Sequence, residues 1–433
     1  MKILGIGNDG QGHAMARAIT SSPHEEFRYA FWAPGSPGIN KCAQPWRIDE
    51  PFDVEGMASC AQWLGADLVV VSFEQPLAQG LVDRLAKLGI PCAAPSREAA
   101  QIGANKAVVH SMCRALDVPM PRGEVCFSLQ EAHASVNAAG ERKVVVKATG
   151  LTEGRGVFMC ANREEAHNAV DRIMQKHEFG EVEGQAVVIQ EYVSGHDVSL
   201  VCAVNGTVIV PLTSVGHYKQ TSAGELGRNT GGMGAHSPSP YLTPEMEAGV
   251  VARFIHPVLC RLEQEGTPYK GILGAHMMLT EAQPLLLGFT LGFGEPEAEV
   301  IITRLDPQSG PDLLTILQAT TNSDALRTIE PAWKPERAVC VVAAVEGYPD
   351  EPIVRGDEVV GINTAKNMGA FIFQAGTTFG DDGRVVTNDS RVLVVSALGL
   401  TYQGASNTCY RAMRMIHWPG AWCRLDIGLN LDT

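Results

Sequence analysis

Two basic residues and a run of glycines lie together near residue 150. Lys147 ends an apolar stretch, glycines follow at positions 150, 154 and 156, and Arg155 stands between the last two. Glycines let a turn close over a ligand, and lysine and arginine can neutralise phosphate. A second apolar stretch begins at Val157, so we expect a turn between two strands and not a P-loop. An ordinary glycine hairpin with two solvated basic residues is the alternative interpretation.

Two further segments offer groups that could contact a ligand. The stretch 187–197 is a predicted strand running into a loop, and it carries the Gln190 amide and the Asp197 carboxylate in order. Such an edge can bind an adenine and a ribose. The stretch 227–234 has four glycines in eight residues, which favours close approach of a ligand to the backbone.

The segment 5–13 is also rich in glycine. It follows a predicted strand and opens a predicted helix, so its backbone N–H groups and the helix dipole could hold an anion. Its spacing departs from the dinucleotide fingerprint, and a structural tight turn is the alternative.

The elements that must position these groups indicate an α/β protein of several domains. In the first hundred residues, apolar runs at 2–6, 67–71 and 90–92 alternate with helical patterns at 14–20 and 81–88, which predicts a doubly wound parallel sheet. A mixed α/β body follows, with strands at 143–147 and 186–191 and a helix at about 244–266. The proline-containing stretch 327–336 predicts a connection, and strands near 338–345 and 391–397 predict a small last domain.

Composition excludes several classes of protein. The 433 residues are 45% hydrophobic, which excludes disorder, and the net charge of −14 argues against a nucleic-acid binder. The 11 cysteines show neither a CxxC pair nor a disulfide spacing, and no apolar run approaches 18 residues. We expect a cytoplasmic protein with small-molecule partners and no membrane association, as a monomer or homodimer.

Many motifs in one order resemble those of the ATP-grasp ligases, and most closely the glycinamide ribonucleotide synthetase (phosphoribosylamine glycine ligase) family. The matching segments span nearly the whole chain and lie at 7–14, 74–77, 106–107, 147–157, 229–234, 293–297, 347–349, 375–377, 391–393, 397–399 and 426–428. The resemblance implies an N-terminal domain at 1–102, an ATP-grasp domain at 103–328 with a mobile lid at about 121–191, and a C-terminal domain at 337–433.

The resemblance also implies an activity, in which ATP phosphorylates the carboxylate of an amino acid and an amine attacks the acyl phosphate to give an amide, ADP and phosphate. It assigns catalytic roles to Lys147, Arg155 and Asn229. The residues implied to bind ATP are Lys106, Lys147, Gly154, Gly156, Gln190, Glu191, Val193 and Asp197. The residues implied to bind the amino acid and amine substrates are Gly10, His13, Glu74, Gly231, Gly232 and Glu297.

The reactive motifs depart from the family pattern. The family expects Mg²⁺, but Gly288 and Thr290 replace its two magnesium ligands, so we assign no metal ligand from the sequence. Asp9 adds a negative charge where a sugar phosphate should lie. His276 stands where the family has a small residue, and it either reaches the pocket or packs in the core. Three hypotheses follow. The chain is a ligase of the family type with impaired catalysis, its metal held by phosphates, water and unconventional ligands, or a ligase redirected to another substrate, or a non-catalytic homologue that binds nucleotide or a protein partner.

Overall fold

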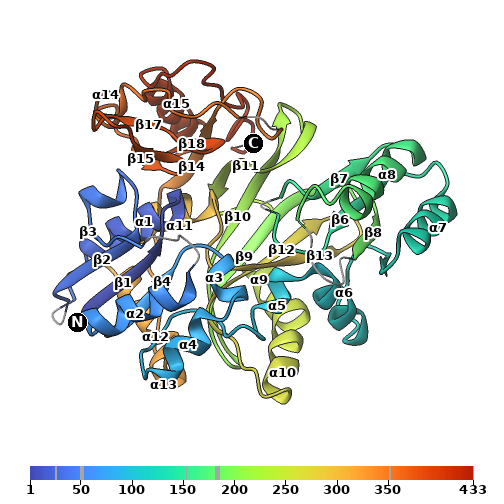
Figure 1. Cartoon of the computed structure of the whole chain (residues 1–433), viewed down its shortest axis with the longest axis horizontal. Helices are drawn as coiled ribbons and strands as arrows, with labels where there is room; N and C mark the ends of the chain where they lie inside the picture. The colour runs from blue at the N-terminus through green and yellow to red at the C-terminus, as the bar shows by residue number, and fades with distance from the viewer. Residues whose placement is uncertain (25–26, 49–52, 153, 181–185, 351–352, 433) are drawn as a thin grey trace.

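The computed structural model describes residues 1–24, 27–48, 53–152, 154–180, 186–350 and 353–432. They form three domains with the ATP-grasp architecture, arranged around a long central sheet (Figure 1). In that view the N-terminal domain lies at the left in blue, the lid at the right in teal, and the C-terminal domain at the top in red. No helix among the described residues is long and apolar enough to cross a membrane.

The N-terminal domain is built on a parallel sheet, as the apolar runs predict. Its strand order is β3-β2-β1-β4, and β1 pairs in parallel with both β2 and β4. The predicted strand at 90–92 makes only a single bridge from Cys92 to Val69, because Pro91 has no N–H to continue a ladder. The elements are β1 (Lys2–Gly7), α1 (Gly10–Thr20), β2 (Tyr29–Pro34), η1 (Ile39–Lys41), β3 (Gln44–Pro45), α2 (Val54–Leu64), β4 (Leu68–Val71), α3 (Gln75–Ala78) and α4 (Leu81–Lys87).

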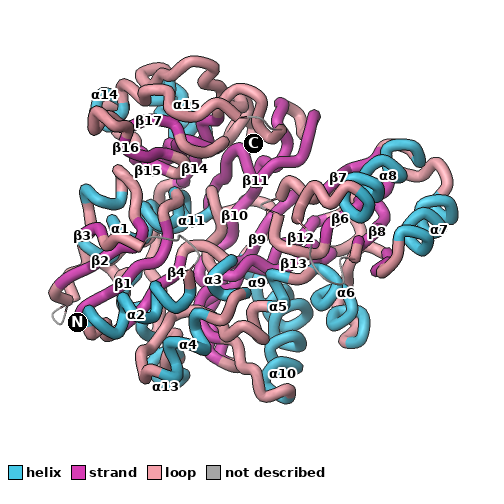
Figure 2. Tube along the Cα trace, in the orientation of Figure 1, coloured by secondary structure: helices cyan, strands magenta, loops and turns pink. Residues whose placement is uncertain are grey.

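The lid is a four-stranded sheet in the order β5-β8-β6-β7. Its helices α7 and α8 lie on the side away from the central strands (Figure 2). The lid has an apolar core of its own, drawn from residues 126–189, whereas the other cores join several parts of the chain. The elements are β5 (Gly123–Cys126), α7 (Leu129–Ala139), β6 (Val144–Ala148), β7 (Val157–Cys160), α8 (Arg163–Val170), η2 (Asp171–Gln175) and β8 (Val187–Glu191).

The central sheet has eight strands in the order β13-β12-β9-β10-β11-β14-β18-β15. It runs from the ATP-grasp body into the C-terminal domain, because β11 pairs with β14. The elements of the body are α5 (Gln101–Ala104), α6 (Lys106–Ala115), β9 (His196–Asn205), β10 (Val208–Ser222), β11 (Leu226–Ser237), α9 (Pro244–Val250), η3 (Val251–Ile255), α10 (His256–Gln264), β12 (Lys270–Leu279), β13 (Pro284–Leu291), α11 (Glu297–Arg304), α12 (Leu313–Ala319) and α13 (Ser323–Leu326).

The C-terminal domain packs one long helix on its share of this sheet. Residues of β14, β18 and α15 form a continuous buried core, which includes Val341, Val395 and Cys409. The elements are β14 (Arg337–Ala344), α14 (Ile362–Lys366), β15 (Phe371–Gln374), β16 (Thr377–Phe379), β17 (Val385–Thr387), β18 (Arg391–Gly399) and α15 (Tyr402–Met413). The stretch 327–336 holds no helix or strand, as its prolines predict.

Candidate active site

A cavity of about 1120 Å³ lies where the domains meet. Its lining comes from the N-terminal domain, the lid, the body and the C-terminal domain. Eleven of the predicted site residues line it: Glu74, Lys106, Lys147, Gly154, Gln190, Glu191, Val193, Asp197, Asn229, Gly231 and Glu297. Residues far apart in the sequence therefore face one space.

Two lysines lie on one side of this cavity, one from the body and one from the lid. Lys106 begins helix α6, which the Asn105 side chain caps, and its Nζ donates to the carbonyl of Gly150 at 2.9 Å. Lys147 lies near the end of β6. Burial lowers the pKa of each lysine to about 8, and for Lys147 the charge of Lys106 adds to the effect. An anion that contacts both would stabilise their charged forms and raise both pKa values.

The glycine loop of the lid rests on strand β11. Gly154 has φ of +79°, which favours glycine, and a Cβ there would lie 2.6 Å from the carbonyl oxygen of Thr230. Asn229 Nδ2 donates to the Gly154 carbonyl at 3.0 Å. The loop therefore closes on the body through backbone contacts that only a residue without a side chain permits. Glu153, which belongs to the same predicted loop, lies outside the described residues.

The edge of β8 carries the groups predicted to bind a nucleoside. Gln190 is 3% exposed, and its amide nitrogen donates to the carbonyl of Pro121 at 3.4 Å. Glu191 accepts from the backbone N–H of Arg122 at 2.9 Å. Val193 follows at the cavity wall. The β8 edge and the residues after it thus bring Gln190, Glu191 and Val193 to the cavity, and the predicted carboxylate of Asp197 comes from the next strand, β9.

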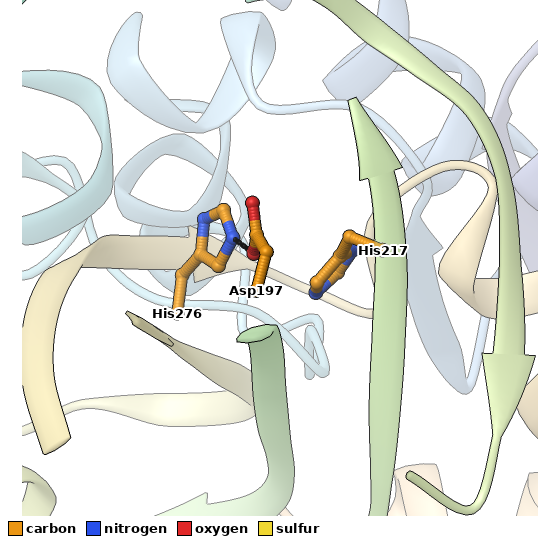
Figure 3. A group of neighbouring side chains, drawn as sticks. All are labelled: Asp197, His217 and His276. Atoms are coloured by element: carbon orange, nitrogen blue, oxygen red, sulfur yellow. Dashed lines mark hydrogen bonds and ion pairs between the residues drawn. The ribbon is translucent and has the colours of Figure 1, made fainter. Parts of the chain in front are cut away.

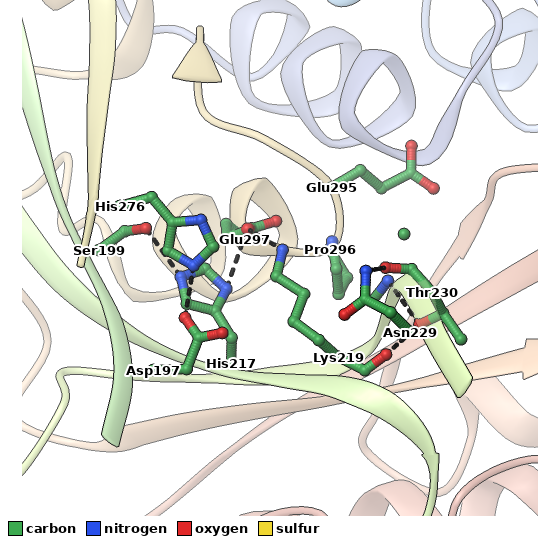
Figure 4. Close-up of polar contacts among 12 residues, drawn as sticks. Asp197, Ser199, His217, Lys219, Asn229, Thr230, His276, Glu295, Pro296 and Glu297 are labelled. Atoms are coloured by element: carbon green, nitrogen blue, oxygen red, sulfur yellow. Dashed lines mark hydrogen bonds and ion pairs between the residues drawn. The ribbon is translucent and has the colours of Figure 1, made fainter. Parts of the chain in front are cut away.

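Polar side chains from three neighbouring strands form a network on the cavity floor (Figure 4). His276 Nε2 contacts Asp197 Oδ1, and His217 Nε2 lies 2.8 Å from the hydroxyl of Ser199. Burial would raise the pKa of Asp197, but His276 outweighs it and lowers that pKa to about 2. The Asp197 carboxylate is therefore ionised. His276 lines the cavity, which agrees with the hypothesis that it reaches the pocket.

Glu297 connects this network to the start of helix α11. Its Oε1 lies 3.0 Å from Nδ1 of His217 and 3.6 Å from Nζ of Lys219. Burial alone would raise the pKa of Glu297, but the charges of Lys219 and His217 lower it well below the usual range. Glu297 is therefore an anion held between two basic groups.

Three carboxylates meet at the N-terminus of helix α1. Asp9 caps the helix by accepting from Gly12 N at 2.8 Å, and Glu295 Oε2 accepts from Gly10 N at 3.2 Å. Glu299 is fully buried against the same turn, where a Cβ on Gly10 would meet its Oε1 at 2.4 Å. Burial raises the pKa of Asp9 and raises that of Glu295 to about 7. The helix end expected to hold an anion is already occupied by carboxylates.

Five predicted site residues, among those the structure describes, do not line the cavity: Gly10, His13, Arg155, Gly156 and Gly232. His13 is 4% exposed, because its Nδ1 accepts from the backbone N–H of Gln374 at 2.9 Å and its ring packs on Phe373. Burial lowers the pKa of His13 to about 3, so the ring is neutral and joins two domains.

The glycines of 227–234 serve packing as well as the cavity. They lie within strand β11, and Gly231 alone among its glycines faces the cavity. A Cβ on Gly232 would lie 2.6 Å from Cδ of Pro296, and one on Gly234 would lie 2.4 Å from the carbonyl oxygen of Cys340. Neighbouring backbone and side chains therefore fill the space beside Gly232 and Gly234, and contact of a ligand with Gly232 stays a prediction.

Sequence reasoning missed several residues that line the cavity. Lys219 lies next to His217 on β10, and Arg391 and Arg424 come from the C-terminal domain. Arg391 Nη1 donates to the carbonyls of Gly231 and Glu295, each at 3.0 Å. Arg391 belongs to the motif at 391–393, which contributes to the resemblance, and this motif is the signal in the sequence that could have identified it.

The three-domain fold, the lid and this cavity define an ATP-grasp ligase. Models of the phosphoribosylglycinamide synthetase N domain, ATP-grasp (A) domain and C domain match residues 1–103, 104–298 and 338–430. The chain is 36% identical over 431 residues to the phosphoribosylamine–glycine ligase of Rhodopirellula baltica, covering 98% of this chain and 96% of that one. It is 37% identical over 428 residues to that of Caulobacter vibrioides, covering 99% and 98%.

Solved structures agree with these sequence relatives. The phosphoribosylamine–glycine ligase of Thermotoga maritima superposes with a TM-score of 0.80 at 26% identity, covering 98% of this chain and all of that one. The protein belongs to the phosphoribosylamine–glycine ligase family, a family of ATP-dependent ligases of purine biosynthesis.

Proposed function

We propose that this protein is an ATP-dependent ligase that joins an amino acid carboxylate to an amine. The observation that carries the proposal is the placement of Lys106 and Lys147 under the lid loop, in one cavity with Gln190 and Asp197. The lysines would hold the phosphates, Gln190 to Val193 the adenine, and Asp197 the ribose. A lid that opens and closes about its separate core would admit the nucleotide.

The reaction proceeds in two steps. A carboxylate oxygen of the amino acid attacks the γ-phosphorus, so that a C–O–P bond forms and ADP leaves. The neutral amine then attacks the acyl carbon, a C–N bond forms, phosphate leaves, and the amine loses a proton. The first step brings two anions together and the second releases phosphate, so positioning and charge neutralisation by Lys106, Lys147 and Lys219 would supply most of the acceleration.

The magnesium ligands of the family have no counterparts here that fit that ion. Gly288 offers no side chain, and a Cβ at that position would meet nothing within 4 Å. Thr290 offers a neutral hydroxyl, and the nearby Glu297 is held by His217 and Lys219. Mg²⁺ favours carboxylates, water and phosphate oxygens, whereas the donors nearest to Gly288 include the imidazole of His276. No step is therefore assigned to a bound Mg²⁺.

The amine end of the cavity supports an altered substrate. The relatives are named for phosphoribosylamine, whose phosphate carries negative charge. Here Asp9, Glu295 and the buried Glu299 cluster at the turn where that phosphate is expected. Asp9 and Glu295 already accept from the backbone N–H groups of this turn, so these groups are not free to bind a phosphate, and we infer an amine without a phosphate.

Release of ADP tests this function. We expect slow or absent release with glycine and phosphoribosylamine, and faster release with glycine and an amine that lacks phosphate. The variant Gly288→Glu, Thr290→Asn should gain activity with Mg²⁺. Wild-type turnover of phosphoribosylamine comparable to ordinary ligases would refute both the altered substrate and the impairment. If ADP binds but no amine supports turnover in either protein, a nucleotide-binding role without catalysis replaces the proposal.

A further inference from the structure

Two imidazoles and a carboxylate converge on the cavity floor, each from a different strand. Asp197 lies on β9, His217 on β10 and His276 on β12, and β9 is the strand between the other two. Their ligand atoms all lie within 4.8 Å of one another. Figure 3 shows both rings turned toward the Asp197 carboxylate. The sheet therefore brings together three donors that are up to 79 positions apart in the sequence.

The spacing is close to that of a metal site. Bonds from zinc to imidazole nitrogen and to carboxylate oxygen are about 2.0 to 2.2 Å, so the ligand atoms around one tetrahedral ion lie about 3.4 Å apart. The ligand atoms of Asp197, His217 and His276 lie within 4.8 Å of one another. A side-chain rotation is enough to close the difference from the distance expected around an ion. The rings of His217 and His276 already lie with centroids 4.7 Å apart.

The surroundings resemble the outer shell of a metal site. Metal-bound histidines usually place their second nitrogen on a carboxylate, which fixes the ring and its tautomer. Glu297 Oε1 lies 3.0 Å from Nδ1 of His217, which leaves Nε2 on the side of Ser199 and Asp197. Lys219 would repel a cation, but it pairs with Glu297 at 3.6 Å, so its charge is balanced.

The position of His276 adds a reason to expect an ion here. His276 is the direct cross-strand partner of Gly288 on β13. Paired residues project to the same face of a sheet, so the imidazole lies on the face to which a side chain at position 288 would project. A nitrogen donor thus lies beside the position from which the resemblance implies a lost carboxylate.

We propose that Asp197, His217 and His276 bind a divalent transition-metal ion, of the class of Mn²⁺, Co²⁺ or Zn²⁺. Two histidines and one carboxylate suit such ions better than Mg²⁺, and three protein ligands leave coordination positions open to water or a phosphate. The proposal that an ion binds here depends on these three residues alone and not on the proposed function. Its use toward nucleotide phosphates rests on the proposed function, and an ion on Asp197 would replace the ribose contact that the proposed function gives this carboxylate.

Titration of the metal-free full chain with Co²⁺ tests the proposal, because bound Co²⁺ gives visible absorption that reports its geometry. We expect one saturable Co²⁺ per chain without nucleotide. His276→Gly, which restores the family's small residue, and Asp197→Asn should each weaken binding at least about tenfold, because loss of an outer-shell partner alone costs about 10- to 100-fold. Circular dichroism checks that both variants are folded, and Ser199→Ala supplies a milder change beside His217.

Two matched variants control for other histidines. His196→Gln alters a histidine of the same cavity that stacks on Tyr241, and His167→Gln breaks a separate histidine pair in the lid. Both should bind Co²⁺ as the wild type does. The proposal would be overturned if no saturable Co²⁺ binding is seen, or if His276→Gly and Asp197→Asn bind Co²⁺ as tightly as the wild type. The three residues would then form only a hydrogen-bonded network. Retained Co²⁺ binding with no ADP binding would instead contradict the proposed function and leave the metal site intact.

Discussion

The two lysines under the lid make nucleotide affinity depend on pH. Burial lowers the pKa of Lys106 and of Lys147 to about 8, whereas a bound phosphate would raise each well above that value. Affinity should therefore be highest below pH 8 and fall as the pH rises through 8. Between pH 7 and pH 9, one such lysine costs about a factor of ten in the dissociation constant, or about 1.4 kcal/mol. Two independent lysines would cost about a hundredfold, and their mutual repulsion makes this an upper limit.

Variants of Lys147 separate its contribution from that of Lys106. Lys147→Ala should weaken ADP binding at pH 7 by about 10- to 150-fold, because a hydrogen bond to a charged group is worth about 1.5 to 3 kcal/mol. It should also reduce the loss between pH 7 and pH 9 to about tenfold. Lys147→Arg keeps a charge that does not titrate, so it should show the same shallow pH dependence with a smaller loss of affinity.

Calorimetric titration with ADP at several pH values measures these constants without turnover. Lys87→Ala, on the surface of helix α4, is the control and should follow the wild type. A wild-type affinity that does not change between pH 7 and pH 9, together with unchanged affinity in Lys147→Ala, would show that the phosphates bind elsewhere. Circular dichroism at each pH excludes unfolding as the cause of any loss.

Three further outcomes follow from the same geometry. Gly154→Ala should raise the Kd for ADP at least about tenfold, since its Cβ would lie 2.6 Å from the Thr230 carbonyl; an unchanged Kd would show that the loop need not close there. Burial raises the pKa of Glu295 from 4.5 to about 7, so the folded state holds a proton that the unfolded chain has lost, and stability should fall as pH rises through 4.5 to 7 by at most about 3 kcal/mol. Urea unfolding at pH 5 and pH 8.5 should show Glu295→Gln stabilised only at the higher pH, and equal effects at both would contradict the burial argument. Burial lowers the pKa of His13 from 6.5 to about 3, so the folded protein should lose stability as the pH falls through that window. His13→Gln should therefore flatten the dependence of the unfolding free energy on pH at the acid end of a urea-unfolding series. An unchanged slope would mean that the buried ring is protonated.

Much of the fold could be predicted because its signals are local. Apolar runs predicted the parallel N-terminal sheet, and the glycines between Lys147 and Val157 predicted a turn between two strands, which β6 and β7 flank. The joining of body and C-terminal domain into one sheet has no local signal, because β11 and β14 pair about 100 positions apart. The domain boundaries also stay predictions, because the joining of domains through one sheet has no local signal in the sequence.

Only those parts of the site that lie within one sequence motif could be predicted. Gln190 to Asp197 belong to one continuous segment, which runs from the end of β8 to the start of β9, and both ends of the segment line the cavity. Glu295 meets Gly10 across 285 positions, and His276 meets Asp197 across 79, so neither contact leaves a trace in sequence spacing. His13 lies in a sequence motif, but its Nδ1 accepts a hydrogen bond from the backbone N–H of Gln374. Packing between domains decides which face of α1 is buried, and the motif does not show it.

Both ends of the cavity differ from the family pattern in their polar groups. At the floor, the imidazole of His276 lies across from Gly288, where the resemblance implies a carboxylate, and imidazole favours a transition-metal ion over Mg²⁺. At the helix α1 turn, the carboxyl groups of Asp9 and Glu295 accept from backbone N–H groups that would otherwise face a phosphate. Between them the phosphate-facing lysines of the family pattern are kept. We therefore propose a ligase with changed partners before an inert homologue, and the ADP-release assay with glycine and an amine that lacks phosphate decides between them.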